Sequence, residues 1–72
     1  MFKLAFIYDD FTYPKRDYNL GGSYIFQGEK YACIGNRENA KQFKSKKVAE
    51  NVYKKIYASC TNVSNKYEIE EV

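Results

Sequence analysis

The stretch that decides the fold is residues 43–60, FKSKKVAENVYKKIYASC. At about 100° per residue, its apolar side chains gather on one arc roughly 120° wide. They are Val48, Ala49, Val52, Ile56 and Cys60, with Tyr53 at the edge of the arc. The opposite side is polar and includes Glu50 and Lys54, which form an i,i+4 pair in the favourable order. Because Ser45 is a suitable N-cap, the stretch predicts one amphipathic helix that packs on a core with one face.

Alternating or apolar runs on both sides of this helix predict strands. The predicted strands are residues 2–8, 23–27, 30–34, 40–43 and 66–70. The second and third form a hairpin, since Gly28-Glu29 suits a type II′ turn, and 40–43 is a brief third strand of the same meander. In the last strand, Tyr67 and Ile69 point inward. The order predicts a single α+β domain over residues 1–72, a small and mainly antiparallel β-sheet with one α-helix packed on one face (β-loop-ββ(β)-α-β).

Residues 9–22 are predicted to form a long loop. Pro14 argues against a central strand there, and Gly21-Gly22 allows the chain to turn back. Connections of this length are usually functional, and Tyr with Arg is typical of protein–protein hot spots. The predicted partner-binding residues are Phe11, Tyr13, Lys15, Arg16, Tyr18 and Tyr24. The alternative is that these rings form a small core beneath the loop.

A single helix covers only one face of the sheet, and both faces of the predicted hairpin are apolar. One face carries Tyr24, Phe26 and Tyr31, and the other carries isoleucines. An uncovered apolar face larger than roughly a few hundred Å² is unusual for a monomer. We therefore expect a homodimer or a standing partner of another kind. The remaining alternative is a monomer in which the 9–22 loop closes the face.

Catalytic chemistry is largely missing from the sequence. The 72 residues include no His, the usual proton-transfer group near neutral pH. Cys33 and Cys60 are isolated in apolar patterns, so we expect free thiols, and no spacing indicates a metal site or a cofactor. We predict that the protein is not an enzyme. No apolar run approaches a membrane span and no signal peptide is evident, which favours a cytoplasmic protein.

The net charge of +3 is unevenly distributed, because residues 37–55 carry seven basic and two acidic side chains. Cations near a helix start are disfavoured by the helix dipole, so the basic residues there need an explanation. They are Lys44, Lys46 and Lys47, which could form one basic face together with Arg37 and Lys41. An alternative function is therefore binding of a nucleic acid or a nucleotide phosphate. The low overall charge argues against nucleic acid, and Lys is also an ordinary residue on a solvated helix surface.

The motif FKSKKVAE at residues 43–50, followed through the helix to YEIE at 67–70, resembles small bacteriophage and prophage accessory proteins. Their usual build is a hairpin, a short A-x-x-F strand, an S-x-x-x-A-E helix and a terminal strand. The resemblance covers residues 24–72, and the 9–22 segment has no counterpart in it. It implies a protein of the host cytosol that acts by stoichiometric binding, such as an inhibitor or modulator of a host defence protein. A small structural subunit of a larger complex is a further alternative.

Overall fold

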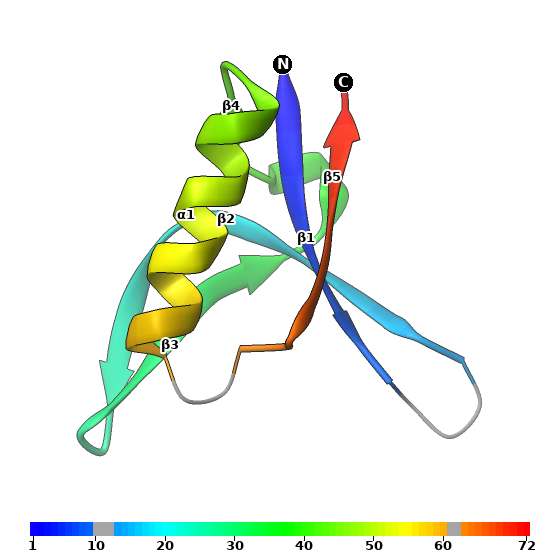
Figure 1. Ribbon diagram of the computed structural model, residues 1–72. Coiled ribbons are helices and arrows are strands. Elements are labelled where there is room, and N and C mark those ends of the chain that lie inside the picture. The colour runs from blue at the N-terminus through cyan, green and yellow to red at the C-terminus, as the bar shows by residue number, and fades with distance from the viewer. Residues whose placement is uncertain (10–12, 61–62) are drawn as a thin grey trace.

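The computed structural model describes residues 1–9, 13–60 and 63–72. The predicted α+β class is confirmed: the described strands form one curled antiparallel sheet, with a single helix packed against it (Figure 1). The elements are β1 (Phe2–Tyr8), β2 (Lys15–Phe26), β3 (Glu29–Gly35), the 3₁₀-helix η1 (Arg37–Asn39), β4 (Gln42–Phe43), α1 (Lys46–Ser59) and β5 (Lys66–Glu71).

The central strand is β1, and its bounds are those predicted. One of its edges pairs with β5, from Phe2 opposite Glu71 to Ile7 opposite Lys66. Its other edge is shared by β4 and by the first part of β2. The predicted strand at 40–43 is therefore present in shortened form, but its place in a meander was wrong, because β4 pairs with β1. The sheet order is β3-β2-β1-β4, with β5 on the other side of β1.

The hydrophobic core lies between β1 and α1. Leu4 and Phe6 have no exposed surface, and they pack in one cluster with Ala49, Tyr53 and Ile56. Ala5 points to the other face of the sheet, as alternation requires, and belongs to a separate small cluster with Tyr18 and Ala40. The centre of β1 is thus buried on both faces.

The predicted helix and its cap are confirmed. The Ser45 hydroxyl accepts a hydrogen bond from the Val48 backbone N–H at 3.2 Å, and Glu50 pairs with Lys54 at 3.4 Å. The buried arc differs slightly from the prediction, because Val48 is 45% exposed and Tyr53 is buried. The Tyr53 ring stacks on Tyr67 with 4.0 Å between ring centroids, which turns the helix toward β5. No helix among the described residues has the length and apolar character needed to cross a membrane.

The predicted loop at 9–22 was wrong, because most of it is the first half of β2. Pro14 lies just before the strand, where it breaks no ladder. Gly21 and Gly22 do not turn the chain back; with φ of +98° and +78° they form a bulge inside the strand. Asn19 pairs with Ile34 and Ser23 with Ala32, so residues 20–22 lie opposite Cys33 alone.

The bulge is held by Asn19, which is buried. Its side-chain Oδ1 accepts the Gly21 backbone N–H at 2.9 Å, and its backbone carbonyl accepts the Lys41 N–H at 2.9 Å. These bonds attach β2 to the segment that leads into β4. They mark the point at which β2 leaves β1 and continues with β3 alone.

The predicted hairpin is confirmed, but its turn is displaced by one residue. Phe26 pairs with Glu29, so the turn residues are Gln27 and Gly28, with φ of +50° and +82°. Positive φ at both positions is the type I′ arrangement instead of type II′. Relative to the predicted hairpin, each β2 residue pairs with a β3 residue two positions away from the expected one. Each side chain therefore stays on its predicted face, but its cross-strand partner changes. Tyr24 now lies opposite Tyr31.

The bulge supplies a stability test at Gly22. A Cβ there would meet no neighbouring atom within 4 Å, so Gly22→Ala introduces only the strain of a positive φ. We expect it to lower the free energy of unfolding by about 1–2 kcal/mol, measured by urea denaturation. Ser23→Ala, at the next and exposed position of the same strand, should change it by no more than about 0.5 kcal/mol. Equal effects of the two substitutions would contradict the conformational role of Gly22.

Candidate protein-binding surface

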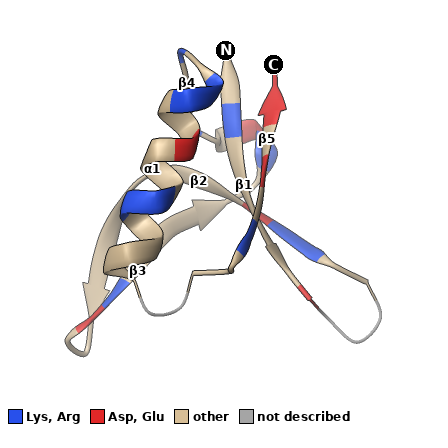
Figure 2. Cartoon of the chain, viewed as in Figure 1, with Lys and Arg blue, Asp and Glu red and all other residues tan. Residues whose placement is uncertain are grey.

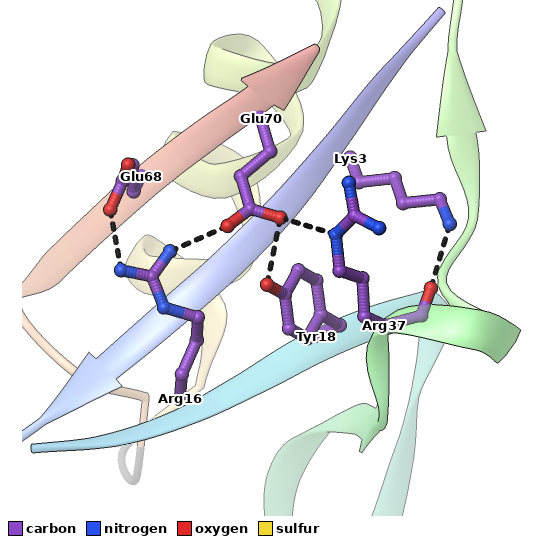
Figure 3. A network of polar contacts seen from close by, with 6 residues as sticks. All are labelled: Lys3, Arg16, Tyr18, Arg37, Glu68 and Glu70. Carbon is purple, nitrogen blue, oxygen red and sulfur yellow. Dashed lines mark hydrogen bonds and ion pairs between the residues drawn. The ribbon is translucent and has the colours of Figure 1, made fainter. Parts of the chain in front are cut away.

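The sheet face opposite α1 is polar over β1, and a network centred on Glu70 occupies it (Figure 3). Arg16 donates from Nη1 to Glu70 Oε1 at 2.8 Å and from Nη2 to Glu68 Oε2 at 2.7 Å. The other Glu70 oxygen accepts from the Tyr18 hydroxyl at 2.7 Å and from Arg37 Nε at 3.1 Å. One carboxylate therefore links β2, β5 and η1.

The strand register explains why these residues meet. Ala5 of β1 lies opposite Tyr18 on one side and opposite Glu68 on the other. Its methyl group leaves room for the side chains of β2 and β5 to reach across β1. The stem of Lys3, which is also buried, runs along the same face, and its ammonium donates to the Arg37 carbonyl at 2.7 Å.

The network sets the protonation of its members. Burial acts to raise the pKa of Glu70, but hydrogen bonds from Tyr18 and Arg37 and the charges of Arg16 and Arg37 outweigh it, so the pKa lies below its ordinary value. Burial raises the pKa of Tyr18, and its hydrogen bond to the Glu70 carboxylate raises it further. Both groups are held in the state that keeps the network intact at neutral pH: an ionised carboxylate and a protonated phenol.

Two of the predicted partner-binding residues belong to this network. Tyr18 is buried, so its prediction as an exposed contact was wrong. Arg16 keeps an exposed side, but its guanidinium is bound to two carboxylates. The predicted second apolar face belongs to the hairpin and does not extend over β1. Once 15–20 forms a strand, its polar residues pair with the acidic residues of β5. The surface there is internally satisfied.

The other predicted contacts are dispersed. Phe11 lies outside the described residues. Lys15 is exposed, and its Nζ lies 3.5 Å from Oδ2 of Asp17. Tyr13 is 71% exposed, but it precedes β2, whereas Tyr24 lies near the far end of that strand (Figure 1). The structure does not bring the six predicted residues together into one site.

The basic residues of the alternative site are also separated. Arg37 is bound to Glu70, and the Lys41 ammonium lies 6.0 Å from the centroid of the Phe43 ring. Lys44, Lys46 and Lys47 remain exposed around the first turn of α1, and the ion pairs among the described residues include none of these three.

A different surface stands out at the far end of the β2–β3 hairpin. Three consecutive large apolar residues are exposed there: Tyr24 by 50%, Ile25 by 68% and Phe26 by 60%. Leu20 and Ile34 add partly exposed side chains on the same two strands. We call these five residues the hairpin surface. Tyr24 stacks on Tyr31 with 5.4 Å between ring centroids, so part of the surface is preorganised.

The hairpin surface is uncovered because of where α1 packs. The helix lies over β1, β4 and β5, and the hairpin turn extends past its C-terminal end (Figure 1). Ala32 belongs to the helix-side core, so the isoleucines lie on the helix side and the tyrosine pair on the other. Tyr24 was predicted as a contact, whereas Ile25 and Phe26 were not selected. The sequence feature that could have identified Ile25 and Phe26 as contacts was the apolar character of both hairpin faces.

The described residues offer no group of three or more His, Cys, Asp or Glu side chains that could hold a metal ion. Cys33 is half-buried and Cys60 is buried, and both are free thiols. A comparison of the chain with known proteins finds no matching family model, no matching curated protein and no matching solved structure. The assignment of a candidate site therefore depends on the geometry of this structure alone.

The Glu70 network predicts a pH dependence of stability. Because the folded-state pKa of Glu70 lies below its ordinary value of 4.5, its ionised form stabilises the fold above that pH. This contribution is lost as the pH falls through the lowered pKa. Glu70→Gln should cost about 1–3 kcal/mol at pH 7 and should flatten the decline in stability on acidification, measured by urea denaturation at several pH values. Glu71→Gln, at the exposed neighbouring position, is the control and should leave both quantities nearly unchanged. A wild-type pH profile in Glu70→Gln would contradict the assignment.

Proposed function

We propose that this is a small non-enzymatic protein that acts by stoichiometric binding to another protein through the hairpin surface. The observation that carries the proposal is the run Tyr24, Ile25 and Phe26, each at least half exposed at the end of one strand. Side chains alternate along a strand, so Tyr24 and Phe26 share one face of the hairpin and Ile25 lies on the other. Scattered apolar residues on a surface are ordinary, but neighbouring ones, such as these two rings, commonly mark an interaction site. The two aromatic residues are of the kind enriched at the centres of interfaces.

The chemistry of the hairpin surface suits burial against a protein. Its exposed residues are uncharged, and on β3 the charged residues are only Glu29 and Lys30, beside the turn (Figure 2). Such an arrangement resembles an interface with an apolar centre and a polar rim. Because the backbone of a paired hairpin is already ordered, docking would not incur the entropy cost of folding a loop.

The resemblance to phage and prophage accessory proteins supports a host protein, including one of a defence system, as the target. Binding of this kind would inhibit or modulate the target without chemistry by the chain itself. The alternative of a structural subunit differs in one observable respect. A subunit would purify only within a constitutive complex, whereas an inhibitor is stable alone and binds when its target is added.

The test is affinity capture of host proteins by the wild-type chain and by Phe26→Ser. Replacing an exposed ring with a hydroxyl should remove the capture of one stoichiometric protein and weaken its affinity in calorimetry by about tenfold or more. The fold should persist, since the Phe26 side chain lies outside the hydrophobic core.

Val48→Ser is the matched control, because Val48 is an exposed apolar residue on α1. It should capture the same protein as the wild type. Equal capture by Phe26→Ser and the wild type would overturn the hairpin surface as the binding site. So would loss of capture in Tyr13→Ala alone, or recovery of nucleic acid in place of a protein.

A further inference from the structure

Two of the outer strands of the sheet, β3 and β5, differ in how their open edges are protected. Exposed strand edges invite pairing with other chains, and proteins commonly block them with charged residues. β5 is such a blocked edge, because Lys66, Glu68, Glu70 and Glu71 account for most of its residues. β3 has charges only at its first two residues, and Tyr31-Ala32-Cys33-Ile34-Gly35 follows without a charge or a proline.

The sheet topology also leaves the outer edge of β3 open for pairing with another strand. Among the described strands, β3 pairs with β2 alone. The turn 26–29 closes the hairpin with a pair at Phe26 and Glu29, and inward-facing amides alternate with outward-facing ones along an antiparallel strand. The N–H groups of Lys30 and Ala32 therefore point away from β2, toward the open edge.

We propose that this edge pairs with the β3 strand of a second copy of the chain, giving a twofold dimer with one continuous antiparallel sheet. A second copy is the occupant that the strand itself specifies, because an uncharged edge is complementary to another edge of the same kind and a twofold axis needs only one surface. With the axis near Ala32, the Glu29-Lys30 end of each strand lies beside the uncharged Ile34-Gly35 end of its partner. No like charges then oppose each other across the new pair.

The dimer would place two hairpin surfaces side by side on one sheet, which would add avidity to the binding proposed above. The pairing itself does not rest on that function. It concerns the backbone edge of β3, whereas the proposed target binding is carried by the side chains of Tyr24, Ile25 and Phe26 on β2. The two can therefore fail separately. A wild-type chain that stays monomeric but captures its target would overturn the edge pairing and leave the proposed function standing, whereas a dimer that captures no target would do the reverse.

The experiment is sedimentation velocity of the whole chain over a concentration series, combined with amide hydrogen exchange. We expect a concentration-dependent dimer in which exchange at Lys30 and Ala32 slows as the dimer forms. Ile34→Lys adds a charge to the open edge and should weaken dimerisation by about tenfold or more. Ile25→Lys makes the same change on β2, away from the outer edge of β3, and should leave the dimer intact.

Lys30→Pro is the second variant, because it removes an outward N–H without affecting the inward bonds of the hairpin. It should abolish the dimer while circular dichroism and the melting temperature stay near those of the wild type. A chain that remains monomeric at every concentration would overturn the proposal. A dimer that survives Lys30→Pro, or that Ile25→Lys disrupts and Ile34→Lys does not, would also overturn it, since it would form through a face of the hairpin or through the open edge of β2.

Discussion

The rest of the structure depends on how a sheet covered by one helix accommodates its second face. The solution is the carboxylate of Glu70, on the face of the sheet to which Ala5 points. A larger residue than Ala5 in the middle of β1 would separate β2 from β5 on this side. With a methyl group there, Arg16, Tyr18 and Arg37 converge on Glu70. A partly buried carboxylate is unfavourable alone, but it is stabilised when several donors satisfy its oxygens. The face that could have been a second hydrophobic layer is instead a closed polar layer, and it needs no cover.

The apolar residues left over are displaced to the distal hairpin, and the bulge is the cause. At Asn19 the strand β2 stops following β1 and continues with β3 beyond the reach of α1. A two-stranded ribbon outside the core has two open faces and two open edges, so its side chains cannot all be buried by its own chain. The location of the hairpin surface and the bare edge of β3 therefore share one topological origin.

The sequence predicted correctly those elements whose structure is determined by residues nearby in the chain. The bounds of β1, the Ser45 cap and the apolar faces of α1 and β5 each follow from periodicity within one segment. The first half of β2 could not be recognised this way, because Lys15-Arg16-Asp17 is stabilised by β1 and by residues some fifty positions away, Glu68 and Glu70. Gly21-Gly22 is as typical of a turn as of a bulge, and only the pairing with β3 decides between them. Tyr18 was misassigned for the same reason: an aromatic residue in a supposed loop is expected to be exposed, whereas in a strand beside Ala5 it is buried.

The size of the chain connects stability with binding. A domain of 72 residues buries a smaller fraction of its surface than a larger one and is correspondingly marginal. Here the core is confined to β1, α1 and their immediate neighbours, while the hairpin contributes little beyond Ala32 to it. Any partner that covers the hairpin acts only on the folded state, so its binding free energy adds to the stability of the whole domain. Under the proposed function, a hairpin that is already an ordered ribbon would lose less conformational entropy on binding than a flexible recognition loop.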